Sequence, residues 1–244
     1  MPSSPSLSRR NFLNLFGLGA ASTLAGCATY STVPRYVPSY PIAPTRLPWM
    51  DGPVSGSGVS TAELDVMYGP REDNGYLIPA VPYDQIPPQY YRQRVSNPTG
   101  EPSGTVVVDT AARYLYLVEP GGTAMRYGVG IGREGFAWQG EGVIQWRKKW
   151  PRWNPPDEMV ARKPELVKYS IANGGMDPGL DNPLGARALY IFQNGQDTLY
   201  RLHGSPEWQS IGKAVSSGCV RLLNQDVIDL YDRVPNKARI VVWQ

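Results

Sequence analysis

Proline and glycine interrupt this chain so often that long helices are excluded over most of its length. The 244 residues include 24 prolines and 26 glycines, and both residue types weaken or end helices and strands. From Ala28 to Pro102, 75 residues hold 13 prolines and show no helical or alternating apolar period. Such a segment buries too little apolar surface to offset chain entropy. We therefore predict a disordered Pro/Gly/Tyr-rich tether at residues 28–85 and a folded domain at 86–244.

Apolar runs of the kind found in β-strands begin abruptly at Thr105. Two hairpins are predicted, one of them around the turn signal Asn194-Gly195. The strands expected in these hairpins are Thr105–Asp109 with Tyr114–Val118, and Arg187–Gln193 with Thr198–Leu202. Further strands are expected at Met125–Ile131, Gly142–Trp146 and Arg239–Trp243. The domain is therefore predicted to be mainly β.

One short helix is expected near the carboxyl end. Its apolar stripe consists of Val227, Ile228, Leu230, Tyr231 and Val234. Asn224 is expected to cap the first turn, Asp226 suits the positive helix start, and Pro235 ends the helix.

Residues 1–27 are typical of an export signal. The run Ser8-Arg9-Arg10-Asn11-Phe12-Leu13 is similar to a twin-arginine motif, and Phe12–Ala25 is apolar but too short for a confident membrane span. Leu24-Ala25-Gly26-Cys27 is similar to a lipobox, in which Cys27 would become acylated; simple signal cleavage at this site is the alternative. The protein is therefore predicted to reach the periplasm of a Gram-negative bacterium, anchored to a membrane through a lipid on Cys27.

Cys219 and His203 form the candidate catalytic pair. The chain has two cysteines and one histidine, so once Cys27 is acylated or removed, Cys219 has no disulfide partner. A free thiol in an oxidising compartment is a liability unless it is used, although a buried inert cysteine is the alternative. The thiol is mostly protonated at neutral pH, and a neighbouring imidazole can take its proton and return it to a leaving amine.

The ordered set His203-Gly204-Ser205 and Ser217-Gly218-Cys219-Val220-Arg221 strongly resembles the catalytic signature of the YkuD-type L,D-transpeptidases. Three further segments extend the resemblance from about Thr105 to Gln244: Val107–Val118, Trp153-Asn154-Pro155-Pro156 and Asn182-Pro183-Leu184-Gly185. The family commonly has histidine where Ser217 stands, so all acid–base work is expected from His203. The fold implied is a YkuD-like β-sandwich or barrel with one short helix after the cysteine.

The resemblance implies acyl transfer on peptidoglycan stem peptides. Cys219 would attack the carbonyl of the third stem residue and release D-alanine, and an amine would then take the acyl group, giving a 3→3 cross-link or a protein attached to the wall. Backbone N–H groups of Gly218 and Cys219 would form the oxyanion hole, and the Gly204 carbonyl would hold the imidazole. Acceptors include stem peptides and outer-membrane or periplasmic proteins. A cysteine hydrolase that trims stems or releases wall-linked protein, and an inactive wall-binding lipoprotein, are the alternatives.

Several residues near this signature are candidates for substrate binding. Arg221 is expected to bind a stem carboxylate or a structural acidic partner. Ser216 and Ser217 are expected mainly to satisfy loop backbone, and Tyr190 either lines the cleft or packs in the core. The basic and aromatic run Trp146–Trp153 suits a sugar-bearing polymer or simple packing better than nucleic acid, because the net charge of +3 falls to +1 once Arg9 and Arg10 are removed with the leader. No cofactor is implied, and the lone histidine argues against a usual zinc site.

Overall fold

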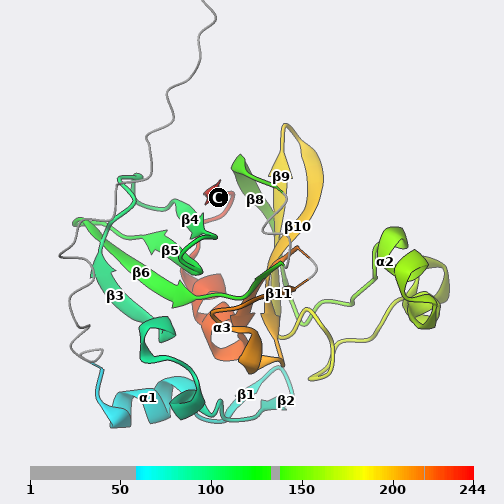
Figure 1. Ribbon diagram of the computed structural model, residues 1–244, viewed down its shortest axis with the longest axis horizontal. Coiled ribbons are helices and arrows are strands. Elements are labelled where there is room, and N and C mark those ends of the chain that lie inside the picture. The colour runs from blue at the N-terminus through cyan, green and yellow to red at the C-terminus, as the bar shows by residue number, and fades with distance from the viewer. Residues whose placement is uncertain (1–58, 133–137, 217) are drawn as a thin grey trace, which may run out of the picture. The chain divides into compact units, whose positions relative to one another are not determined.

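The computed structural model describes residues 59–132, 138–216 and 218–244. Within these ranges lies a nine-stranded mixed sheet of order β12-β10-β9-β8-β13-β4-β5-β6-β3 (Figure 1). Its strands are β3 (Gln93–Ser96), β4 (Val106–Asp109), β5 (Tyr114–Val118), β6 (Thr123–Gly128), β8 (Gly140–Lys149), β9 (Arg187–Gln193), β10 (Gln196–Ser205), β12 (Val220–Leu223) and β13 (Arg239–Trp243). Two small sheets pair β1 (Arg71–Asp73) with β2 (Tyr76–Ile78) and β7 (Ile131–Gly132) with β11 (Ala214–Ser216).

Helices are short in the described ranges. The α-helices are α1 (Thr61–Tyr68), α2 (Asp157–Arg162) and α3 (Asn224–Arg233), and the 3₁₀ turns are η2 (Tyr83–Gln85), η3 (Pro88–Tyr90), η4 (Pro164–Tyr169), η5 (Ile171–Asn173) and η6 (Trp208–Ser210). No helix in the described parts of the chain is both long and apolar enough to cross a lipid bilayer.

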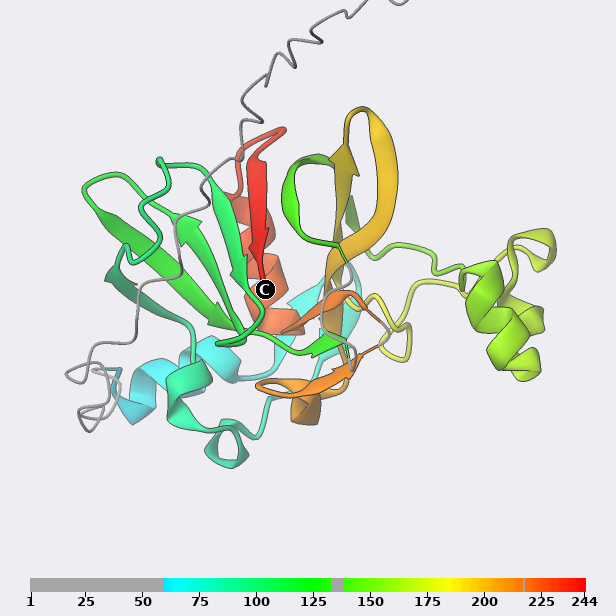
Figure 2. The same ribbon diagram turned by 45° about the horizontal axis from the view of Figure 1, so that its top comes forward.

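The prediction of a mainly β domain is confirmed. Both predicted hairpins are present, β4 with β5 and β9 with β10. The expected sandwich or barrel takes the form of one sheet whose two halves share a core, with α3 between them (Figure 2). Core residues of one half include Val106, Leu115 and Tyr127, and those of the other include Leu189, Ile191, Leu202, Val220 and Leu222.

Helix α3 follows the cysteine as predicted, but Asn224 does not cap it. The helix begins at Asn224 itself, and the capping position is Leu223, which makes no side-chain cap. The Asn224 side chain instead accepts a hydrogen bond from the backbone N–H of Ala186, at 2.9 Å. The apolar stripe is confirmed, since Val227, Ile228 and Leu230 are fully buried.

The predicted tether is wrong for residues 59–85, because these residues form part of the folded domain. Ser60 and Glu63 make a capping box that starts α1. Leu64 and Tyr68 of that helix pack with Ile86, Tyr91, Ile211 and Leu223. The β1–β2 hairpin also contacts the sheet, because Asp73 accepts hydrogen bonds from Arg187 and from Trp150 Nε1. Residues 28–58 of the predicted tether, and the leader at 1–27, lie outside the described residues.

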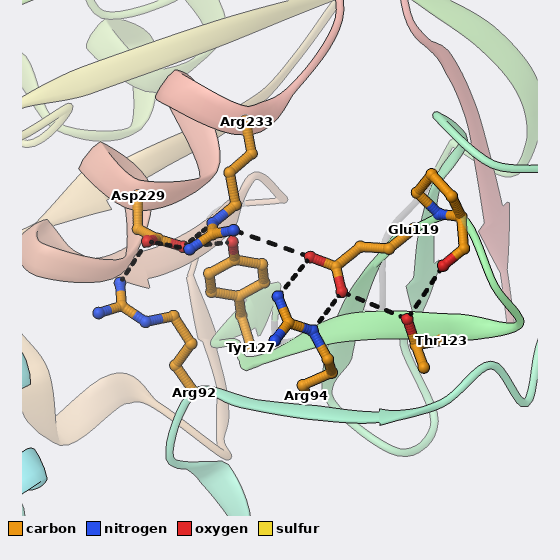
Figure 3. A network of polar contacts seen from close by, with 8 residues as sticks. Arg92, Arg94, Glu119, Thr123, Tyr127, Asp229 and Arg233 are labelled. Atoms are coloured by element: carbon orange, nitrogen blue, oxygen red, sulfur yellow. Dashed lines mark hydrogen bonds and ion pairs between the residues drawn. The ribbon is translucent and has the colours of Figure 1, made fainter.

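A network of charged side chains connects α3 to the β3 edge of the sheet (Figure 3). Asp229 pairs with Arg233 and accepts a hydrogen bond from Tyr127 Oη at 2.7 Å. Glu119, just after β5, binds the Arg94 guanidinium through both carboxylate oxygens. Several of these side chains line a cavity of about 770 Å³ against α1, and neither Cys219 nor His203 borders that cavity.

Candidate active site

The two candidate catalytic residues come from neighbouring parallel strands. In the pairing of β10 with β12, His203 lies opposite Arg221 and Leu202 lies opposite Val220. Extending this register by one residue places Cys219, which immediately precedes β12, beside Arg201. Because side chains alternate between the two faces of a sheet, Arg201, His203, Cys219 and Arg221 belong to one face, whereas Leu202 and Val220 enter the core.

His203 is buried and held by backbone carbonyl groups. Its Nδ1 lies 2.6 Å from the carbonyl oxygen of Gly204, which is the contact that the family resemblance implied. A carbonyl oxygen can only accept a hydrogen bond, so Nδ1 carries the hydrogen and Nε2 of the neutral ring is left as the basic nitrogen. Burial lowers the pKa of His203 to about 4, the charges of Arg221 and Arg201 act in the same direction, and hydrogen bonds with the backbone of Gly204 and Pro183 oppose the shift.

Cys219 is a partly exposed free thiol. Burial raises its pKa, while a hydrogen bond with the backbone of Arg201 and the positive charges of Arg201 and Arg221 lower it. With the imidazole pKa near 4 and the thiol pKa raised, both groups are neutral at rest. A neutral thiol and a neutral imidazole are the starting states that general-base catalysis requires.

Ser216 supports the loop that carries the thiol. Its Oγ donates to the carbonyl of Cys219 at 2.7 Å and accepts from the backbone N–H of Gly218 at 3.3 Å. Ser216 therefore satisfies loop backbone, as predicted. The N–H of Gly218 points to Ser216, which differs from the expected oxyanion role. Gly218 has φ of 121°, a conformation that L-residues rarely adopt, so glycine is required here.

Close packing behind His203 explains the glycine that follows it. A Cβ on Gly204 would clash with Asn224 Oδ1 and lie 3.1 Å from the backbone nitrogen of Ala186. The Asn224 side chain thus occupies the space beside Gly204 and, through its bond to the Ala186 N–H, connects the first residue of α3 to the start of β9. The residue whose carbonyl holds the imidazole therefore has no room for a side chain.

Comparison with known proteins identifies the family of the chain. Residues 103–242 match the family model described as YkuD, the L,D-transpeptidase catalytic domain. The chain belongs to this family. The Escherichia coli protein named "Probable L,D-transpeptidase YbiS" is 33% identical over 144 residues, which cover 55% of this chain and 43% of that protein. The chain thus spans less than half the length of the curated relatives it matches.

Solved structures are similar to this YkuD domain as well. A Brucella melitensis structure titled as a probable carnitine operon oxidoreductase is 44% identical, with a TM-score of 0.45, and the match covers 63% of this chain and 94% of that one. An L,D-transpeptidase from Mycobacterium smegmatis is 17% identical with a TM-score of 0.40, over 57% of this chain and 58% of that one. The family assignment rests on the family model and not on these superpositions.

Two arginines flank the candidate catalytic residues in this YkuD domain. Arg221 Nη1 donates to Glu207 Oε2 at 2.6 Å, so the guanidinium has the acidic partner that the sequence allowed, and that partner is exposed. Arg201 was missed by sequence reasoning. Both carboxylate oxygens of Asp197 bind its guanidinium, which stacks over the Tyr190 ring at 4.4 Å from the centroid. The sequence could have identified Arg201, because it lies two residues before His203 on a predicted strand and alternating strand residues share a face.

Tyr190 stacks with Arg201 and does not belong to the hydrophobic core clusters of the described residues. It is half-buried on β9, opposite Arg201 on one side and Trp146 on the other. Ser217 and Cys27 lie outside the described residues. In the described part of the domain, no group of three or more His, Cys, Asp or Glu side chains is arranged to hold a metal ion.

Proposed function

We propose that this protein is a peptidoglycan L,D-transpeptidase with Cys219 as nucleophile and His203 as general base and acid. The observation that carries the proposal is the lone imidazole on β10, held through Nδ1 by the Gly204 carbonyl at 2.6 Å, next to the strand that begins at the thiol. This arrangement leaves Nε2 as the ring atom that can take and return a proton.

The reaction proceeds in two acyl transfers. Cys219 Sγ attacks the carbonyl carbon of the third stem residue while its proton passes to Nε2 of His203. The tetrahedral intermediate collapses, the C–N bond to D-alanine breaks, and His203 protonates the leaving amine. A thioester remains on Cys219. An acceptor amine then attacks the thioester carbonyl, His203 takes the amine proton, and breaking of the C–S bond returns that proton to the thiol.

The acceptor decides what the enzyme builds. A side-chain amine of a second stem gives a 3→3 cross-link, and an amine of an outer-membrane or periplasmic protein gives a wall-attached protein. Export to the periplasm and a lipid on Cys27 would place the domain near both kinds of acceptor. The twin-arginine-like run and the lipobox-like sequence support this location.

Purified protein incubated with tetrapeptide muropeptides tests the proposal. Dimeric products detected by mass spectrometry are expected, and they should disappear in Cys219→Ala. Tripeptide monomers without dimers would instead identify a hydrolase. Neither product, together with no carbapenem adduct on folded protein, would refute the enzymatic proposal and favour a wall-binding lipoprotein.

A further inference from the structure

A row of side chains crosses the sheet from the thiol to an exposed tryptophan. Position 219 lies beside Arg201, Arg201 pairs with Tyr190, and Tyr190 pairs with Trp146. The row therefore runs over β12, β10, β9 and β8 on one face. Two contacts agree with this register. Arg201 stacks over the Tyr190 ring. The ring centroids of Trp146 and Phe192 lie 6.4 Å apart, and Phe192 is two residues from Tyr190 on the same strand.

Trp146 differs from the other two tryptophans of the basic and aromatic run. Trp150 is 6% exposed and its indole N–H donates to Asp73 at 2.7 Å, and Trp153 is partly buried. Trp146 is 57% exposed, although it lies in the middle of a strand. The contact with Phe192 supports the indole from one side. Packing thus explains the other two tryptophans but leaves much of the Trp146 surface open.

The length of the row matches the length of a stem peptide. Neighbouring strands lie about 4.8 Å apart, so three strand spacings place Trp146 roughly 14 Å from the thiol. An extended peptide covers about 3.4 Å per residue, so the three residues before the scissile bond span about 10 Å. The next group in peptidoglycan is the lactyl-bearing amino sugar. A stem laid along this row, with its third carbonyl at Cys219, therefore brings its sugar to the indole.

The charges along the row suit the same occupant. Lys148 lies two residues from Trp146 on the same strand face, is exposed, and places its Nζ 5.7 Å from the centre of the Tyr190 ring. Stem peptides carry carboxylates, which a lysine at mid-row would attract. Asp197 is fully engaged by Arg201, so it neutralises that guanidinium and does not repel an acidic peptide.

We propose that Trp146 forms a subsite for the amino sugar that bears the donor stem, with Tyr190 and Lys148 along the intervening peptide. Flat faces of sugar rings stack on indole, and one such contact contributes on the order of a tenfold gain in affinity. The inference rests on the proposed function, because it assumes that Cys219 attacks a stem peptide. It adds that the enzyme distinguishes stems that carry sugar from free peptides.

The test compares two donors on the purified full-length protein. We expect kcat/KM for a disaccharide tetrapeptide to exceed that for the free tetrapeptide by about tenfold, and this ratio to fall towards one in Trp146→Ala. Trp146→Phe, which keeps an aromatic face, should retain an intermediate ratio. Val66→Ala removes an apolar side chain that is 87% exposed on α1, and it should keep the wild-type ratio.

The outcomes separate this inference from the proposed function. Equal kcat/KM for both donors in the wild type, or an unchanged ratio in Trp146→Ala, would overturn the sugar subsite while leaving Cys219 chemistry intact. Turnover of neither donor would overturn the proposed function itself. Because the readout is a ratio of two substrates on one preparation, partial unfolding of a variant lowers both values and leaves the ratio unaffected.

Discussion

At the residue scale, the protonation states of Cys219 and His203 decide how the proposed nucleophile would be activated. Cysteine enzymes can hold a resting thiolate–imidazolium pair, but here burial raises the pKa of Cys219 and lowers that of His203 to about 4. Both shifts favour the neutral pair. The positive charges of Arg201 and Arg221 oppose the shift on the sulfur and reinforce the one on the ring.

The pH dependence of thiol alkylation follows from this arrangement. We expect the rate of iodoacetamide modification of Cys219 to rise about tenfold per pH unit from pH 5 to pH 8, because the thiolate is a minor species throughout. Peptide mapping by mass spectrometry isolates Cys219 from Cys27. As the pH is lowered, kcat/KM should decrease with a midpoint near pH 4, because His203 becomes protonated there. A rate plateau beginning near pH 5 would instead reveal a resting ion pair.

Gly204 is expected to tolerate no side chain. In Gly204→Ala the new Cβ would collide with Asn224, and overpacking of this kind costs about 1–3 kcal/mol of unfolding free energy. The loss of turnover should exceed what the loss of unfolding free energy explains, because the Gly204 carbonyl that holds His203 would be displaced. Gly179→Ala is the matched control, since a Cβ there meets nothing within 4 Å. Chemical denaturation and turnover of both variants give the comparison, and equal effects would contradict the packing argument.

At the scale of elements, α1 is expected to be part of the cooperative fold. Leu64 is 7% exposed and packs with Tyr68 and its partners, whereas Val66 on the same helix is 87% exposed. Leu64→Ala should therefore lose about 2–3 kcal/mol of unfolding free energy, and Val66→Ala less than about 0.5 kcal/mol. Thermal unfolding of the two variants measures the difference. Equal melting temperatures would mean that α1 is not packed on the domain.

Strong local patterns predicted some elements well, and weak ones did not. Helix α3 was predictable because its apolar stripe repeats over two turns, and the hairpin at Asn194-Gly195 because that dipeptide favours a tight turn. Helix α1 was missed because eight residues flanked by glycines and prolines give little periodicity, although Ser60 and Glu63 already spelled a capping box.

Within the candidate site, too, some features could be predicted from local sequence and others could not. Cys219, His203 and the role of Ser216 in the loop could be inferred because their sequence neighbours define them. The stacking of Arg201 on Tyr190 and the row to Trp146 could not, because they arise from the lateral order of β12, β10, β9 and β8. Strand order within a sheet depends on non-local pairing, which local periodicity does not encode.

At the scale of the whole molecule, buried charge connects the amino-terminal part of the domain to α3. Asp226 is fully buried at the start of α3, and its oxygen lies 3.4 Å from Arg92 Nη1, which comes from the segment before β3. Neither carboxylate oxygen of Asp226 has a hydrogen-bond partner among the described residues, and Asp229 on the next turn adds a second negative charge. Burial and Asp229 raise the pKa of Asp226 to about 7, and the positive charge of Arg92 opposes this shift.

This carboxyl group should make the domain less stable as pH rises. The folded state keeps the Asp226 proton up to about pH 7, whereas the unfolded chain releases it near pH 3.8. Between these values the folded state binds more protons, so its contribution to stability declines with increasing pH and levels off above pH 7. In Asp226→Asn the amide mimics the protonated form. The melting temperature of this variant should match that of the wild type near pH 4 and exceed it at pH 8.

Asp232→Asn, on the exposed side of the same helix, is the control. Its melting temperature should change between pH 4 and pH 8 by as much as that of the wild type. A lower melting temperature for Asp226→Asn than for the wild type at pH 8 would show that the ionised pair with Arg92 stabilises the fold.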